Sequence, residues 1–246
     1  MKLRRLRAYW IESKYETIRL LREPSFAITF LAIPVLFYIF FGVIMAPKDV
    51  ATSLATAWFV HWTVVAVAGP GLFGFGMVLA AERGQGLLTL KRALPAPRAG
   101  YLLAKVLMSM VFAGLVMTFL LVVALRWGHV ELPPLRLLSL VGVNMLGSLP
   151  FCAIGLYIGV HASARTAPAL VNLAYLPMMI VAGLFFPLPK SMRSLALISP
   201  QYYQDQLAQF VVGAKSVVAP AVCIVVLCGL TLILFTSAVR RLARVG

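Results

Sequence analysis

Six long runs of apolar residues dominate this chain of 246 residues and restrict what it can fold into. The runs cover approximately residues 26–46, 54–80, 101–125, 137–160, 168–187 and 217–238. Each is close to or above the roughly 20 residues that an α-helix needs to cross the hydrocarbon core of a bilayer. Charged residues make up only 12% of the chain, about half the share found in soluble domains. The sequence therefore predicts an all-α integral membrane protein with six transmembrane helices.

The segment 1–25 precedes the first run and shows a different pattern. On a helical projection its apolar and charged side chains separate onto opposite arcs. The apolar arc holds Leu3, Leu6, Trp10, Ile18 and Leu21, and the opposite side holds Arg5, Glu12, Glu16 and Arg19. This pattern predicts an amphipathic helix in the membrane interface that ends before Pro24, with its two acids in water. A helix that packs on a soluble partner is the alternative.

The basic residues predict the orientation of the runs. With six spans both termini lie on one side, and segments 1–25, 81–105, 161–167 and 239–246 then share that side. These segments hold sixteen of the 22 lysines and arginines. Cytoplasmic connections are enriched in basic residues. We therefore expect a multi-pass protein of the bacterial inner membrane with cytoplasmic N- and C-termini, and the positive charge does not indicate nucleic acid as a partner.

A polar and basic insert separates the second run from the third. It begins with Glu82, Arg83, Gly84, Gln85 and Gly86, and it continues through Leu90, Lys91 and Arg92 to two prolines. Such an insert is unusual in a chain this apolar. The orientation above places the insert in the cytoplasm, where a soluble partner could bind it and thereby move the transmembrane helices. We treat 81–100 as a coupling segment.

The fifth run and the segment after it are irregular. Pro168 and Pro177 interrupt the run, and residues 188–216 mix short apolar stretches with charged residues. Those residues are too polar for a span and too apolar for a loop in water. The compromise is one or two short outer re-entrant helices, covered by neighbouring protein.

The inventory for catalysis is small. The chain contains no Walker A sequence, so ATP hydrolysis by that route is excluded. His61, His129 and His161 lie far apart in the sequence, and the three cysteines lie within apolar runs without metal-ligand spacing. No aspartate or glutamate falls inside an apolar run, which argues against an ion-coupled carrier. His61 is an ionisable residue well inside a span and is therefore a candidate contact for a substrate.

Two glycine patterns favour close helix packing. Gly69-Pro-Gly71-x-x-Gly74-x-Gly76 lies inside an apolar run without a preceding strand, which excludes a phosphate-binding loop. Gly155-x-x-x-Gly159 is a pattern through which helices approach closely, within the chain or between two copies.

Taken in order, these features resemble the membrane subunits of ABC-2-type exporters. The resemblance rests on the basic N-terminal helix, the six runs, the stretch from Glu82 to Pro97, and Gly183-Leu-Phe-Phe-Pro187 followed by Ile198-Ser199-Pro200. The family usually has Gly-Thr where this chain has Gly84-Gln85-Gly86, so the start of the coupling helix is shifted by a residue or two.

The resemblance implies a 26–246 transmembrane domain of ABC-2 type that pairs with a second copy, normally as a homodimer. It also implies two copies of a separate ATPase subunit that bind ATP and Mg. This chain would hold no cofactor and would not be an enzyme. The coupling residues named above, Glu82 and Arg83 among them, would face the ATPase. An outer gate would include Phe185, Phe186, Pro187, Ser199 and Pro200, and the candidate substrate path would include His61, Trp62, Met178 and Met179.

We therefore expect the permease of an ATP-driven exporter for an amphipathic or lipid-like substrate, such as a drug, a natural product or a lipid-linked glycan. The soft and aromatic side chains of the fifth run are compatible with such a cargo. An intramembrane lipid-modifying enzyme and an ion-coupled secondary carrier remain the alternatives. Surrounding membrane lipid is a further expected partner.

Overall fold

The computed structural model describes residues 2–45, 51–87, 98–186, 188–189 and 193–245, and these residues form helices and connections without strands. The helices are α1 (Lys2–Leu21), α2 (Pro24–Tyr38) with the π-helix η1 (Ile39–Ile44), α3 (Ala51–Gly84), α5 (Arg98–Arg126), α6 (Pro134–His161), α7 (Ala167–Val181), α8 (Arg193–Ala196), α9 (Pro200–Val212) and α10 (Pro220–Val245). All-helical architecture is what a bilayer requires of a chain that is not a closed barrel.

Five helical stretches among the described residues are long and apolar enough to cross a membrane. They are Phe26–Ile44, Leu54–Gly84, Tyr101–Arg126, Pro134–His161 and Pro220–Leu242. The fifth predicted run behaves differently, because α7 has only 15 residues. At about 1.5 Å per residue α7 is roughly 22 Å long, shorter than a bilayer core of about 30 Å. The fold is thus that of a multi-pass membrane protein with five full-length candidate spans and one short apolar helix.

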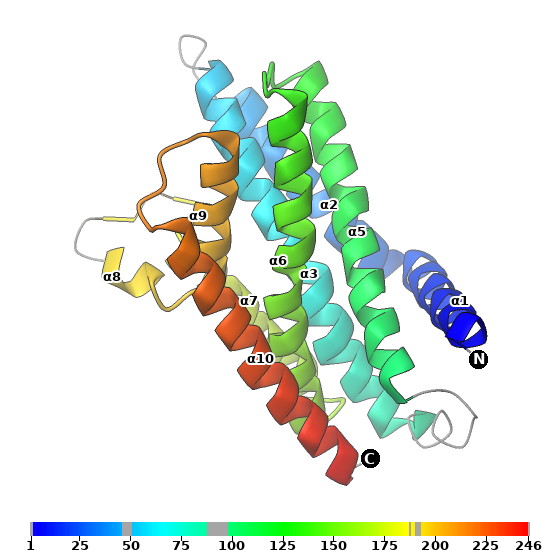
Figure 1. Ribbon diagram of the computed structural model, residues 1–246. Helices are drawn as coiled ribbons and strands as arrows, with labels where there is room; N and C mark the ends of the chain where they lie inside the picture. Colours follow the sequence, from blue (N-terminus) through cyan, green and yellow to red (C-terminus); the bar gives the residue numbers. More distant parts are fainter. Residues whose placement is uncertain (1, 46–50, 88–97, 187, 190–192, 246) are drawn as a thin grey trace.

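Helix α3 is the centre of the bundle. It packs against α2, α5, α6, α7 and α9, and most of its membrane-length window is buried inside the molecule. In Figure 1 the elongated helices lie side by side around α3, and both marked chain ends lie toward the lower part of the view. Helix α3 is also the longest helix of the described chain, with 34 residues. At about 1.5 Å per residue it spans roughly 51 Å, so it joins both ends of the bundle.

Close packing of α3 on α6 depends on the two glycine patterns, as predicted. A Cβ atom on Gly155 would lie 2.6 Å from the carbonyl oxygen of Leu72, and a Cβ on Gly71 would lie 3.0 Å from the backbone nitrogen of Cys152. Both distances are shorter than van der Waals contact. The Gly155-x-x-x-Gly159 pattern therefore serves packing within the chain.

Replacing Gly155 with alanine should lower the free energy of unfolding by about 1–3 kcal/mol, because the added methyl forces two backbones apart. Gly142 is the matched control on the same helix, since a Cβ there meets no atom within 4 Å. Thermal unfolding of the purified variants in detergent measures the difference. Equal melting temperatures for Gly155→Ala and Gly142→Ala would contradict this packing.

Helix α1 presents its polar side to the protein, contrary to the expectation for Glu16. Ser13, Glu16, Thr17 and Leu20 recur at helical spacing and are buried, and α1 packs mainly on α5. Trp10, on the predicted apolar arc, is 68% exposed. The prediction that Glu16 is solvated is therefore wrong, because α5 covers it and supplies Lys105 as its partner.

Candidate functional site

The coupling segment is attached to the bundle by the end of α3 and the start of α5. Helix α3 ends at Gly84, and Gly86 adopts a φ of 73°, a left-handed conformation that glycine allows without strain. Gly84, Gln85 and Gly86 are exposed. The predicted coupling residues Leu90, Lys91 and Arg92 lie outside the described residues.

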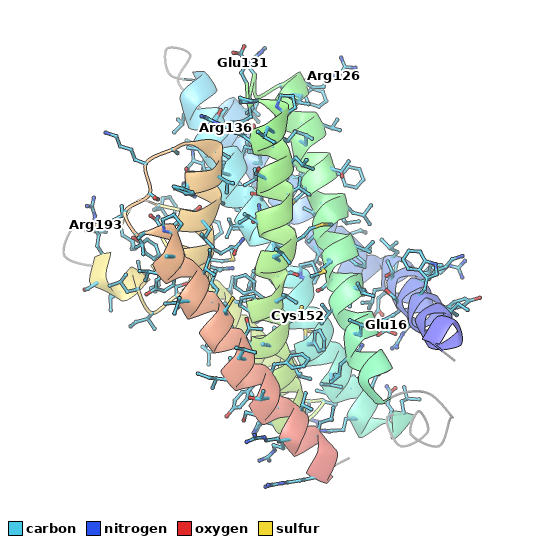
Figure 2. All side chains as sticks on the ribbon, viewed as in Figure 1. Glu16, Arg126, Glu131, Arg136, Cys152 and Arg193 are labelled. Carbon is cyan, nitrogen blue, oxygen red and sulfur yellow. The ribbon has the colours of Figure 1, made fainter. Side chains whose placement is uncertain are left out.

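Next to these attachment points lies a largely buried group of charged and polar side chains, which we call the charge cluster. It consists of Glu16 and Arg19 from α1, Glu82 from α3, and Tyr101 and Lys105 from α5. Lys105 is fully buried, and its ammonium group binds Glu16 and lies 3.4 Å from Glu82. Figure 2 labels Glu16 at the junction between α1 and the bundle. Three helices that are distant in the sequence are thereby tied together.

Groups of opposite charge face one another in the charge cluster. Arg19 donates to Glu82 at 2.6 Å and lies 4.0 Å from Glu16, and the hydroxyl of Tyr101 donates to Glu82. Burial lowers the pKa of Arg19, but the hydrogen bond to Glu82 and the charges of Glu82, Glu16 and Glu23 together raise that pKa by more. Among the described residues, two cations therefore face these two carboxylates. Buried charges are tolerated when they are paired and hydrogen-bonded in this way.

Glu82 and Arg83 both contact other parts of this chain, and their contact with the ATPase stays a prediction. Glu82 is 1% exposed within the charge cluster. Arg83 donates to the carbonyl oxygens of Val160 and Ala162 at the end of α6. An arginine in this position satisfies carbonyl groups that a helix end leaves without partners. Both residues therefore hold the end of α3 in place, and Gln85 is the exposed polar residue beside them.

A second feature is an apolar cavity of about 520 Å³ between α2, α3 and α7. It opens sideways, because several of its lining residues on α2 and α7 are exposed. Glu23 and Asn172 supply polar groups to a lining that is otherwise mainly aromatic and aliphatic. Concave sites of this size with a few polar groups are typical binding sites for small molecules.

The predicted path and gate residues meet at one end of this cavity. Trp62, Met179 and Phe185 line it, and the ring centroids of Trp62 and Phe185 are 5.3 Å apart. Among the described residues, the buried indole N–H of Trp62 has no hydrogen-bond acceptor. A ligand oxygen in the cavity could supply one. Aromatic side chains thus close one end of the cavity.

The remaining predicted residues lie outside the cavity lining. Met178 packs beside it, and the carbonyl oxygen of Met178 accepts a hydrogen bond from Ser199 at 2.8 Å. Pro200 begins α9, and Phe186 is exposed. Pro187 lies outside the described residues.

His61 has a partner that the sequence did not reveal. Its Nδ1 lies 2.7 Å from a carboxylate oxygen of Asp205 on α9. Asp205 falls outside every apolar run. An acidic side chain therefore contacts a spanning helix although no apolar run contains an acidic residue. The buried amides of Asn144 and Gln204 form a second polar contact between the same helices and α6. Gln204 donates to Asn144, and Asn144 donates to Thr63. Polar groups therefore fasten α9 to α3 and α6.

Comparison with known proteins agrees with this geometry. A family model described as ABC-2 type transporter matches residues 7–209, a range that contains the charge cluster and every residue that lines the apolar cavity. YvfS of Bacillus subtilis (strain 168), a protein named as a candidate transport permease, is 27% identical over 199 residues. The aligned region covers 78% of this chain and 80% of YvfS. The chain therefore belongs to the ABC-2 type transporter family and is a multi-pass transporter permease.

Proposed function

We propose that this chain is the membrane half of an ATP-driven exporter, moved by a separate ATPase subunit that docks on the coupling segment. The observation that carries the proposal is the continuity of α3. The same helix ends in the charge cluster beneath the coupling segment and lines the apolar cavity with Trp62 and Phe73. Movement of the segment would therefore reach the cavity as a rigid-body shift of α3. The partner can favour one arrangement only through contacts that differ between two states.

The proposed roles of the ATPase subunits and of a second copy of this chain follow from the family and from the sequence. Two ATPase subunits would bind ATP and Mg, since this chain has no Walker A sequence. A second copy of this chain would complete the pathway, because the sequence shows no internal repeat of its spans. The exposed aromatic and aliphatic residues of α2 and α7 are the face for that contact. In this arrangement α7 makes the remaining crossing, with α8 and α9 re-entrant in the outer leaflet.

The proposed orientation follows from the basic residues. Both termini and the coupling segment would lie in the cytoplasm of a bacterial cell, and the chain would reside in the inner membrane. Residues 1–25 would then form the interfacial helix, with exposed Trp10 turned toward the lipid. Residues 188–216 would form the outer gate region.

The cavity favours an amphipathic or lipid-like substrate moved outward. Its walls are mainly apolar, while Glu23 near one end and the Trp62 indole N–H near the other can each bind a polar group. Soft methionine and aromatic side chains adapt to apolar molecules of varied shape. Drugs, natural products and lipid-linked glycans share these properties.

Cross-linking from Gln85 tests the docking proposal. In a background with the three cysteines replaced by alanine, we expect Gln85→Cys to cross-link to a subunit that contains a Walker A sequence. Val217→Cys is the control, because Val217 is 83% exposed and lies beyond α9, on the proposed outer side. The cross-link is made in native membranes with a short bismaleimide, and the partner is identified by mass spectrometry. Equal yields of that subunit from both positions would contradict the docking proposal.

A further inference from the structure

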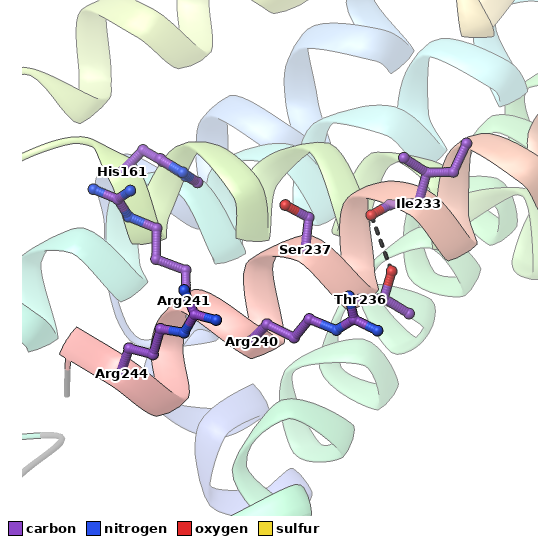
Figure 3. Close-up of a pocket in the computed structure, with 7 residues that line it drawn as sticks. All are labelled: His161, Ile233, Thr236, Ser237, Arg240, Arg241 and Arg244. Atoms are coloured by element: carbon purple, nitrogen blue, oxygen red, sulfur yellow. Dashed lines mark hydrogen bonds between the residues drawn. The ribbon is translucent and has the colours of Figure 1, made fainter.

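A basic pocket between the end of α6 and the end of α10 lies apart from the charge cluster and the apolar cavity. Its volume is about 580 Å³, and it is lined by His161, Ile233, Thr236, Ser237, Arg240, Arg241 and Arg244. Figure 3 shows the side chains of α10 and His161 of α6 around this hollow. No role described above uses these residues.

The positive charge of this pocket is not neutralised by the part of the chain that the structure describes. Arg240, Arg241 and Arg244 are exposed, and none forms an ion pair with a described carboxylate. Glu16 and Glu82 are held within the charge cluster, and Glu131 lies at the opposite end of the bundle in Figure 2. Three guanidinium groups on one helical turn repel each other unless an anion lies between them.

The pocket also carries neutral hydrogen-bonding groups. The Ser237 hydroxyl makes no hydrogen bond to another described residue, so it can donate to a ligand oxygen. His161 donates from Nδ1 to the carbonyl oxygen of Tyr157 at 2.8 Å, so Nε2 of its neutral ring is an acceptor for a ligand hydroxyl. Guanidinium and hydroxyl donors together match the oxygens of a phosphate group.

The surroundings of the pocket identify its occupant as a lipid. Ile233, Ser237 and Arg241 follow one another at i, i+4 spacing, so one row on α10 passes from apolar through hydroxyl to cationic. Above Ile233 the helix continues with exposed apolar residues, among them Val225 and Leu232. A soluble phosphate would use only the cationic end of this row. A phospholipid would use all of it, with its headgroup at the arginines and an acyl chain along Ile233.

We propose that the pocket formed by His161, Ser237, Arg240, Arg241 and Arg244 binds the phosphate headgroup of an anionic phospholipid. Such basic pockets between transmembrane helices are suited to anionic headgroups. The proposed orientation places this pocket in the cytoplasmic leaflet. Only this placement rests on the proposed function. Headgroup binding itself requires neither the ATPase nor transport.

The test uses the purified full-length chain in detergent, without an ATPase. Binding of dioleoyl phosphatidylglycerol is measured by native mass spectrometry and by thermal unfolding, with dioleoyl phosphatidylcholine and inorganic phosphate as comparison ligands. We expect phosphatidylglycerol alone to bind tightly and to raise the melting temperature. Arg240→Gln with Arg244→Gln should weaken this binding about thirtyfold, from about fivefold for each basic residue at a membrane surface. Ser237→Ala, which removes no charge, should weaken it less.

The control pair is Arg126→Gln with Lys215→Gln, which removes the same charge from exposed positions elsewhere. Equal loss of binding in both pairs would overturn the proposal in favour of unspecific attraction. A melting shift with inorganic phosphate as large as that with phosphatidylglycerol would make this a site for a free anion instead. Unchanged lipid binding by the Arg240 and Arg244 variant, with a lower cross-linking yield from Gln85→Cys, would assign the arginines to the ATPase. Failure of the Gln85 cross-link with intact lipid binding would count against the proposed function and leave the lipid site standing.

Discussion

Replacing Lys105 with methionine is expected to lower the free energy of unfolding by about 3–5 kcal/mol, the usual cost of removing one partner from a buried ion pair. The side chain is fully buried, and its ammonium group forms ion pairs with both Glu16 and Glu82. Without it, Glu16 would lose its hydrogen-bonded cation, and Arg19 lies 4.0 Å from that carboxylate. For a chain of this size the melting temperature should fall by roughly 10 °C. Thermal unfolding of the purified protein, followed by size-exclusion chromatography, measures the fall.

Two control variants isolate the charge balance from the loss of a lysine. Lys14→Met removes an exposed lysine from α1 and should change the melting temperature little. Glu16→Gln combined with Lys105→Met removes one charge of each sign and keeps the Arg19–Glu82 pair at 2.6 Å. The combined variant should recover at least half of the lost stability. Similar melting temperatures for Lys105→Met and Lys14→Met would show that the charge cluster does not hold the three helices together.

Replacing Met77 with tryptophan should abolish transport with little effect on folding. Met77 lines the apolar cavity from α3 and is only partly buried. A larger ring can therefore enter the open space without displacing the tightly packed face of α3. The expected change in the free energy of unfolding is below about 1.5 kcal/mol. Transport is measured in vesicles that contain the permease and its ATPase, with a fluorescent short-chain phospholipid as the probe.

The control for this prediction stands at the same position. Met77→Leu conserves the volume and apolar character of the side chain, so it should retain transport. Both variants should also retain the Gln85 cross-link, since Met77 lies about two helical turns before Gln85 and lines the cavity. If Met77→Trp moved the probe at the wild-type rate, the cavity between α2, α3 and α7 would not be the substrate path.

Periodicity and charge predicted most of the architecture. The apolar runs predict the five full-length spans because a bilayer permits few alternatives to a long apolar helix. The glycine patterns predict the close approach of α6 to α3, because the two backbones can come this near only where a residue has no Cβ. The polar character of residues 188–216 predicts short helices, and α8 and α9 lie there.

The partners of the charged residues could not be predicted. Glu16 lies on the charged side of an amphipathic helix, and only tertiary packing brings Lys105 to it across 89 positions of sequence. Asp205 similarly reaches His61 across 144 positions. A helical projection shows which side of a helix is polar, but not whether water or another helix covers that side. The family resemblance assigns Glu82 and Arg83 to the ATPase, but the sequence does not show that Glu82 is buried in the charge cluster or that Arg83 binds the end of α6.

The central claim is that α3 carries the action of the ATPase from the coupling segment to the apolar cavity. The most direct measurement is the rate at which N-ethylmaleimide labels Asn172→Cys, a residue that lines the cavity, in the reconstituted complex without native cysteines. We predict a several-fold change in this rate when the ATPase is trapped with ATP and vanadate. We also predict that Glu82→Gln reduces this change but keeps the Gln85 cross-link. Equal labelling rates in the free and trapped states, while the probe is still transported, would contradict the claim.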